Sequence, residues 1–230
     1  MKAPLLLLHG ALGSASQFSE LEKLLENDFE VFKIDFSGHG KNELHPASIS
    51  IELFTTDVLN FMAENNIESV HIFGYSMGGF VALILALQHP EKVKNIFTLA
   101  TKFNWTKESA ETEIKFLNPE KIKEKVPAFA THLHSLHGNK WEKLIQQTAE
   151  MMLQLGTANP LSFSELAKIK TKVLLALGDS DKMVAVQETL DAQASLKNST
   201  FHIFQNTPHP WEQVNQKLIV EEMIRFFDEN

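Results

Sequence analysis

The segment Val70-His71-Ile72-Phe73-Gly74-Tyr75-Ser76-Met77-Gly78-Gly79-Phe80-Val81 begins like a buried β-strand, turns at its centre and ends like a helix. Ser76 has one glycine two residues before it and another two residues after it, which leaves room for a backbone bend that larger side chains would block. The pattern G-x-S-x-G between a strand and a helix is typical of a nucleophile elbow, which holds the serine out of the turn. We therefore expect Ser76 to act as a nucleophile if the chain supplies its partners.

Short apolar segments of strand length recur along the chain, and most of them are apolar throughout, as strands covered on both faces are. They are residues 3–8, 30–34, 70–73, 93–99, 172–177 and 200–204. Helical patterns lie between them, at residues 14–25, 50–62, 77–88, 186–196 and 211–227. Alternating strands and helices predict an α/β fold, with a parallel sheet and helices on both of its faces.

Residues 103–168 break this alternation, because they contain helical stripes and no segment typical of a strand. Pro127 should kink or split the first of these helices. An all-helical insertion between parallel strands lies beyond their carboxyl ends, where open α/β folds bind ligands. We therefore interpret residues 103–168 as a cap, or lid, on a core made of residues 1–102 and 169–230. The cap side chains expected to supply an apolar pocket wall are Phe103, Trp105, Phe116, Phe129, Trp141, Met151 and Met152.

The composition excludes several classes of protein. A chain of 230 residues suits one domain with a small insertion, and the absence of cysteine excludes disulfides, a cysteine nucleophile and cysteine-ligated metals. A formal charge of −8 argues against a nucleic-acid-binding protein. The apolar run near the start is too short for a signal peptide, and no segment has the length to span a membrane. We expect a cytoplasmic protein, and the sequence indicates no oligomeric state.

A serine nucleophile needs a base, and in elbow enzymes the partners follow along the chain as acid and then histidine. Only His202 and His209 remain beyond residue 172. His202 lies inside a predicted strand, where its side chain belongs to a face of the sheet. His209 lies in the loop 206–210, between the last strand and the last helix. We therefore predict that His209 is the base.

The orienting acid should follow an earlier strand at the same edge of the sheet. Asp179 and Asp181 both lie directly after the strand that ends at residue 177, whereas Asp191 lies within a predicted helix. The turn 178–181 can present its last residue to His209 while Asp179 binds local backbone amides. We predict that Asp181 is the acid.

Hydrolysis through a serine also needs hydrogen-bond donors for the developing oxyanion. One should be the backbone N–H of Met77, which follows the nucleophile at the start of a helix. The second should come from the loop after the first strand, where Ala11 is the preferred donor and Leu12 the alternative.

Together these motifs resemble the α/β-hydrolase superfamily nearly from end to end. They are Leu8-His9-Gly10, Asp35-Phe36-Ser37-Gly38-His39-Gly40, Gly74-Tyr75-Ser76-Met77-Gly78-Gly79, Gly178-Asp179-Ser180-Asp181 and Pro208-His209. The family's first two strands have no counterpart, so the resemblance implies about six strands, all parallel. Within the superfamily the chain is similar to small cytoplasmic esterases with a short helical cap, including pimeloyl methyl ester esterase and the menaquinone-pathway synthase.

No cofactor or metal ion is expected. His132 and His134 lie on different faces of a predicted helix, and no carboxylate stands at a matching spacing, so a metal site with His137 is disfavoured. His9 and His39 are expected to brace their loops through hydrogen bonds.

The favoured function is that of a serine hydrolase that cleaves a small or medium apolar carboxylic ester. One alternative is a catalytically slow ligand sensor on the same fold. The other is a lyase or carbon–carbon hydrolase of the menaquinone-synthase type, which acts on a polyanionic metabolite. Arg225 is the only arginine, so a planar clamp for several carboxylates is disfavoured.

Overall fold

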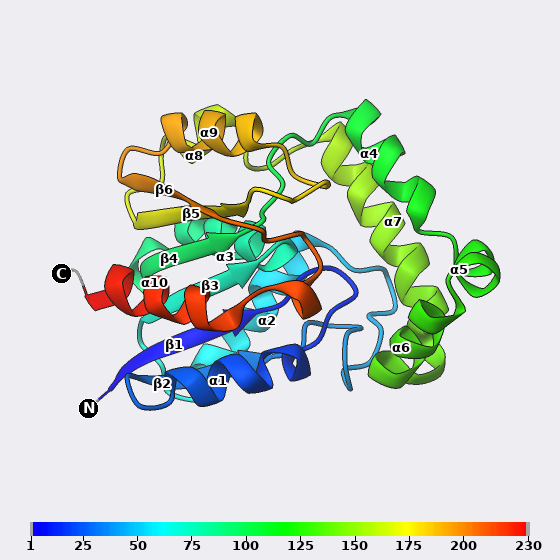
Figure 1. The fold of residues 1–230 in the computed structure, drawn as a ribbon, viewed down its shortest axis with the longest axis horizontal. Coiled ribbons are helices and arrows are strands. Elements are labelled where there is room, and N and C mark those ends of the chain that lie inside the picture. Colours follow the sequence, from blue (N-terminus) through cyan, green and yellow to red (C-terminus); the bar gives the residue numbers. More distant parts are fainter. Residues whose placement is uncertain (1, 229–230) are drawn as a thin grey trace.

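A computed structural model describes residues 2–228, which form a six-stranded sheet (Figure 1). The strands are β1 (Ala3–Leu8), β2 (Phe29–Ile34), β3 (Val70–Tyr75), β4 (Val93–Leu99), β5 (Lys172–Gly178) and β6 (Ser199–Phe204). Their order across the sheet is β2-β1-β3-β4-β5-β6, and all neighbours are parallel. The predicted α/β-hydrolase architecture, with six parallel strands, is confirmed. Residues 1, 229 and 230, which the expected core range includes, lie outside the described residues.

Helices cover both faces of this sheet because its strands are apolar on both faces. In β1, Leu6 and Leu8 pack in the apolar cluster on one side, and Leu5 and Leu7 pack in the cluster on the other. The first side carries α2 (Ile51–Glu64), α3 (Met77–Gln88), α8 (Phe163–Leu166) and α9 (Val186–Ser195). The second carries α1 (Ser19–Leu25) and α10 (Gln216–Asp228).

Local signals explain where several elements begin and end. Ser50 caps α2 by accepting a hydrogen bond from the backbone N–H of Leu53. β3 continues two residues past its expected end, because Gly74 pairs with β1 and Tyr75 pairs with β4. The expected helix at residues 211–227 is divided into the short helix η5 (Trp211–Gln213) and α10, because Val214 adopts an extended conformation between them. The remaining 3₁₀ helices are η1 (Ala15–Phe18), η2 (Pro90–Lys92), η3 (Ile114–Phe116) and η4 (Gly138–Lys140).

The segment between β4 and β5 is helical apart from its loops and lies beyond the carboxyl ends of the strands (Figure 1). Its helices are α4 (Lys107–Glu113), α5 (Pro119–Lys125), α6 (Pro127–His137) and α7 (Trp141–Thr157), followed by α8 against the sheet. Pro127 splits α5 from α6, as its sequence predicts. We call residues 103–168 the cap segment.

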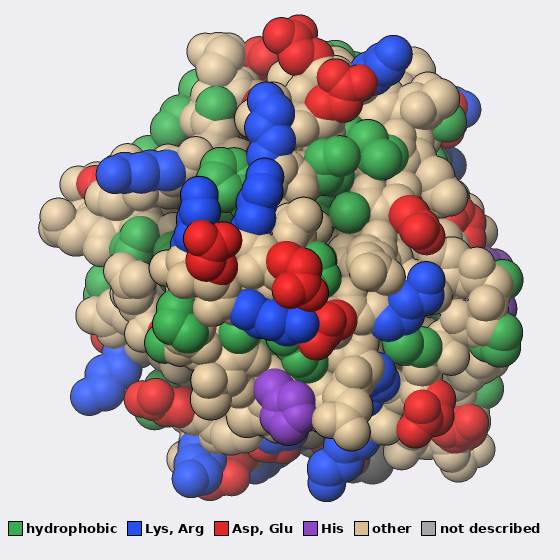
Figure 2. Space-filling model, turned by 90° about the vertical axis from the view of Figure 1, so that its right-hand side faces the viewer, with side chains coloured by type: hydrophobic (Ala, Val, Ile, Leu, Met, Phe, Trp, Pro, Cys, Tyr) green, Lys and Arg blue, Asp and Glu red, His purple; other side chains and the backbone are tan. Residues whose placement is uncertain are grey.

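The cap segment has a small apolar cluster of its own, formed by Ile122, Leu133, Trp141 and Ile145. Figure 2, which views the side of the molecule that carries the cap, shows lysines and carboxylates interspersed with separate apolar patches. Within residues 2–228, no helix combines the length and the apolar character that crossing a membrane requires.

Candidate active site

Ser76 stands at a sharp turn between β3 and α3. Its backbone has φ 51° and ψ −116°, a conformation that non-glycine residues rarely adopt and that needs support from its surroundings. That support comes from β4 and the loop after it. The Ser76 N–H donates to the Leu99 carbonyl over 2.8 Å, and the Thr101 hydroxyl donates to the Ser76 carbonyl over 3.0 Å.

The two glycines of the motif are required by close backbone packing. A Cβ atom on Gly74 would lie 2.4 Å from the Cα atom of Gly79. A Cβ atom on Gly78 would lie 2.1 Å from the carbonyl oxygen of Leu8. These distances are far shorter than van der Waals contact, so no other residue type fits without movement of the backbone. The pattern read from the sequence thus has a direct steric cause.

Asp181 and His209 meet at the edge of the sheet where the paired strands β5 and β6 both end. The Nδ1 atom of His209 lies 2.7 Å from Oδ2 of Asp181, whose side chain is 1% exposed. The other carboxylate oxygen accepts the N–H groups of Met183 and Val184, over 2.8 and 2.9 Å. Asp181 is thus held by the backbone on one side and faces the imidazole on the other.

Asp179 has different partners. Its Oδ1 atom accepts hydrogen bonds from the Ser180 hydroxyl, over 2.9 Å, and from the Thr207 N–H, over 3.4 Å. The carboxylate therefore closes its own turn onto the loop that carries His209, and it is Asp181 that contacts the imidazole. These different partners distinguish the two aspartates: Asp179 stabilises the turn, and Asp181 binds the imidazole.

Tyr75 belongs to the site, although nothing in the G-x-S-x-G pattern indicates a role for this residue. Its hydroxyl donates to the backbone carbonyl of His209. The centroid of its ring lies 5.4 Å from the centroid of the Trp211 ring. Burial raises the pKa of this hydroxyl, so it stays protonated as a donor. Tyr75 therefore ties the loop of His209 to the residue beside Ser76. Among the described residues, no hydrogen bond joins the Ser76 hydroxyl to His209.

The loop after β1 lies beside the elbow, because Leu8 of β1 pairs with Gly74 of β3. The Gly13 N–H donates to the Gly10 carbonyl over 3.1 Å and closes a turn in which Leu12 has φ 59°. Ala11 and Met77 both line a cavity next to Ser76. The N–H of Met77 is in the first turn of α3, where the helix itself supplies no acceptor.

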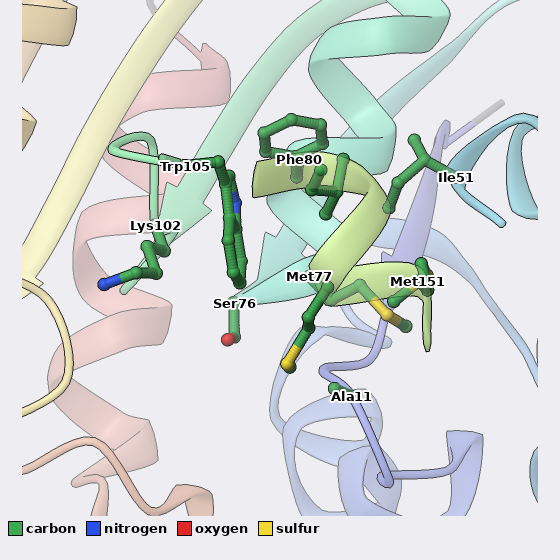
Figure 3. Close-up of a pocket in the computed structure, with 10 residues that line it drawn as sticks. Ala11, Ile51, Ser76, Met77, Phe80, Lys102, Trp105 and Met151 are labelled. Atoms are coloured by element: carbon green, nitrogen blue, oxygen red, sulfur yellow. The ribbon is translucent and has the colours of Figure 1, made fainter. Parts of the chain in front are cut away.

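The cavity next to Ser76 is small, about 40 Å³, and mostly apolar (Figure 3). It is lined by Ala11, Ile51, Ser76, Met77, Phe80, Lys102, Trp105, Met151, Met152 and Leu155. Trp105, Met151 and Met152 had been expected there from the sequence. Ile51 and Phe80 had not, because their helical stripes indicate only core packing. Figure 3 shows the ammonium group of Lys102 directed away from the apolar residues.

The four other aromatic residues expected in the pocket lie elsewhere. Phe103 is 3% exposed and packs in the main core, and Trp141 belongs to the cap's own cluster. Phe116 and Phe129 are 74% and 42% exposed to solvent. Both side chains face solvent, an orientation that a stripe in the sequence does not determine.

Two histidines expected to brace loops are fully buried. His9 is hydrogen-bonded through Nδ1 to the Gly10 carbonyl over 2.8 Å, and its Nε2 accepts the Phe36 N–H over 3.2 Å. Burial lowers the pKa of His9 to about 4 and that of His39 well below its usual value, so both are neutral near pH 7. No cluster of ligating side chains in residues 2–228 could hold a metal ion.

Comparisons with known proteins agree with this geometry. A family model described as "alpha/beta hydrolase fold" matches residues 3–119. A probable alcohol acetyltransferase of Cyberlindnera fabianii is 35% identical over 92 residues, which are 39% of this chain and 25% of that protein. The chain thus matches about a quarter of the length of that relative.

Two further comparisons extend over most of the chain. The 2-hydroxy-6-oxononadienedioate/2-hydroxy-6-oxononatrienedioate hydrolase 2 of Pseudomonas putida is 28% identical, over 89% of this chain and 78% of that protein. The enol-lactonase structure from Burkholderia xenovorans LB400 has a TM-score of 0.78 and 18% identity, and covers 100% of this chain and 92% of that one. The latter likeness shows a shared fold.

Proposed function

Because the chain belongs to the α/β-hydrolase fold family, we propose that it is a serine hydrolase that cleaves a carboxylic ester through an acyl-enzyme on Ser76. The observation that carries this proposal is the hydrogen-bonded pair of Asp181 and His209. Tyr75, the neighbour of Ser76, holds the backbone of that histidine. An acid, a base and an elbow serine are the groups that nucleophilic hydrolysis requires.

In the proposed reaction, the Ser76 hydroxyl attacks the ester carbonyl and its proton passes to His209. His209 then gives this proton to the departing alcohol. Water, deprotonated by the same histidine, cleaves the acyl-enzyme to release the acid. Asp181 keeps the proton of the imidazole on Nδ1 and stabilises its charged form. The contact between Ser76 and His209 belongs to the substrate complex, since such hydrogen bonds are often long in unliganded enzymes.

The N–H groups of Met77 and Ala11 are the proposed donors to the oxyanion, with Leu12 as the alternative to Ala11. Met77 adds the positive end of the α3 dipole. Ala11 is preferred because it lines the cavity beside Ser76, and Leu12 is absent from the lining. Loss of one such donor costs other enzymes about 10²–10³ in kcat.

The cavity supports a preference for short acyl groups. About 40 Å³ holds only a few water molecules, and its wall of Trp105, Met151 and Met152 offers few polar anchors. Longer chains therefore require the cap segment, residues 103–168, to move. We propose that this segment acts as the substrate lid of a core formed by the rest of the chain, and that the protein works in the cytoplasm.

The test combines labelling with turnover. The protein should react with a fluorophosphonate probe and hydrolyse p-nitrophenyl acetate and butyrate faster than octanoate and palmitate. Ser76→Ala should abolish both labelling and turnover. Labelling that survives this substitution would refute the proposal. Turnover at background level together with a tight small-molecule ligand would instead favour a ligand sensor. A kcat/KM that keeps rising to palmitate would refute the short-chain preference.

A second candidate is hydrolysis of a carbon–carbon bond, which the match to the Pseudomonas putida hydrolase favours. That protein's name indicates a dicarboxylate substrate. The cation that lines the cavity is Lys102. Its Nζ atom forms an ion pair with Oε1 of Glu113 over 3.2 Å, so its charge already has a partner. Arg225 lies in α10 and forms an ion pair with Glu222. Direct assay of a dienedioate against p-nitrophenyl butyrate decides between the two reactions.

A further inference from the structure

His137 extends from the cap segment into the core. It ends α6, its residue is 2% exposed, and both of its ring nitrogens bond to backbone atoms of core loops. Nδ1 is 2.9 Å from the N–H of Gly40, and Nε2 is 2.9 Å from the carbonyl of Leu12. An amide N–H can only donate and a carbonyl can only accept, so the ring is neutral and carries its proton on Nε2. Burial lowers the pKa of His137, which favours this neutral form.

The carbonyl that His137 holds belongs to an unfavourable turn residue. Leu12 has φ 59°, a left-handed conformation that costs a residue with a side chain about 1–2 kcal/mol. Such a conformation persists where surrounding contacts fix it. Within the turn, the bond from Gly13 to Gly10 closes the backbone. From outside the turn, the hydrogen bond from His137 fixes the peptide group after Leu12.

Lys140 also links this end of the cap to the core loop that contains Gly40. Its ammonium group donates to the carbonyl of Gly40 over 2.8 Å and to that of His137 over 3.1 Å. Gly40, with φ 52°, is therefore held by the cap through both its N–H and its carbonyl. The buried imidazole of His39 lies 5.8 Å from that of His137, and the carboxylate of Asp35 accepts N–H groups of the neighbouring loops. This end of the cap is thus fixed to two loops of the core.

We propose that His137 is a positioning residue for the oxyanion hole: by holding Leu12 from the cap, it keeps the turn 10–13 in the conformation that points the Ala11 N–H at the reacting carbonyl. This inference rests on the proposed hydrolase function. It follows that the α6 end of the cap stays docked to the loops of Leu12 and Gly40 during turnover.

The test uses two substitutions that differ in hydrogen bonding. His137→Phe fills the space and makes neither bond, whereas the amide of His137→Gln has an acceptor and a donor that can replace both. We expect His137→Phe to lower kcat about tenfold to a hundredfold, less than outright loss of a donor, with KM within about threefold. His137→Gln should recover most of this loss. His134→Phe is the matched control, because His134 lies on the same helix, is exposed, and its imidazole bonds the side chain of Asn139 instead of a core loop.

A second readout separates positioning from loss of folded protein. A trifluoromethyl ketone adds to a serine as a tetrahedral oxyanion, so its affinity should fall in parallel with kcat in His137→Phe and recover in His137→Gln. Equal kcat in His137→Phe and wild type, or a loss that His137→Gln does not repair, would overturn the proposal.

Amide hydrogen exchange of residues 10–13 and 38–40 gives a readout that does not depend on catalysis. Faster exchange in His137→Phe, with slow exchange in His137→Gln and His134→Phe, supports the fixing of the loop by His137. Unchanged exchange in all three variants would overturn it. Failure of the wild type to label with fluorophosphonate would refute the hydrolase proposal alone, because the exchange experiment would still report on the loop.

Discussion

Replacing Asp181 by asparagine tests the acid–base assignment most sharply. One carboxylate oxygen of Asp181 accepts two backbone N–H groups, and the other faces Nδ1 of His209. Asparagine offers one oxygen and one NH₂ group. Its oxygen must remain on the two N–H donors, so the NH₂ group must face His209. Nδ1 then has to accept a hydrogen bond, and the imidazole proton moves to Nε2, where it leaves no lone pair for the Ser76 hydroxyl.

The expected loss follows from this exchange of tautomers. An Asp-to-Asn change that leaves geometry intact and reverses the tautomer costs a serine–histidine–aspartate triad about 10⁴ in kcat, or about 5 kcal/mol. We expect a similar loss here for p-nitrophenyl butyrate, with KM nearly unchanged. The melting temperature should stay close to that of the wild type, because the two amide contacts of Asp181 are preserved.

Asp179→Asn is the matched control, since Asp179 contacts Ser180 and Thr207 and makes no bond to an imidazole. Its kcat should remain within about tenfold of wild type, which corresponds to at most about 1.4 kcal/mol. If Asp181→Asn also stays within tenfold, or if Asp179→Asn loses as much as Asp181→Asn, the assignment of Asp181 is refuted.

Three other substitutions have defined outcomes. Tyr75→Phe leaves the partly buried carbonyl of His209 without its donor, so the free energy of unfolding in urea should fall by about 1–3 kcal/mol; an unchanged value would contradict this role. Burial lowers the pKa of His71 from 6.5 to about 4, so the unfolded chain binds a proton that the folded chain does not, and stability falls as the pH drops through this window. His71→Leu should therefore lose about 3 kcal/mol less than wild type between pH 7 and pH 4 in urea titrations, and equal losses would argue against a neutral His71. Gly78→Ala places a methyl group 2.1 Å from the Leu8 carbonyl and should cost about 3 kcal/mol or more, seen as a lower melting temperature; a fully stable variant would mean that β1 moves easily.

Much of the fold could be predicted because its signals are local. Apolar segments of strand length, a capping serine at residue 50 and a proline at residue 127 each act on the backbone nearby. The elbow could be predicted because steric contacts at Gly74 and Gly78 leave one residue type at each position. The order of nucleophile, acid and histidine along the chain then predicts Asp181 and His209, and the structure brings these two residues together.

The cap residues could not be assigned in the same way. A helical stripe shows that a side chain is apolar, and it does not show whether that side chain faces the sheet, another cap helix or solvent. Trp105 lines the cavity, Trp141 packs within the cap, and Phe116 is exposed, although all three are aromatic residues of one segment. The bonds from His137 to Gly40 and Leu12 join residues about a hundred positions apart, for which a single sequence carries no signal.

Tyr75 is the only tyrosine in the chain, and it stands between Ser76 and the carbonyl of His209. Biosynthetic incorporation of fluorotyrosine would therefore place one fluorine nucleus in the whole protein, directly at the catalytic centre proposed here. A single ¹⁹F resonance would then follow acylation, inhibitor binding and cap motion without any assignment experiment. The buried ring that fixes the histidine loop thus also serves as a built-in spectroscopic reporter.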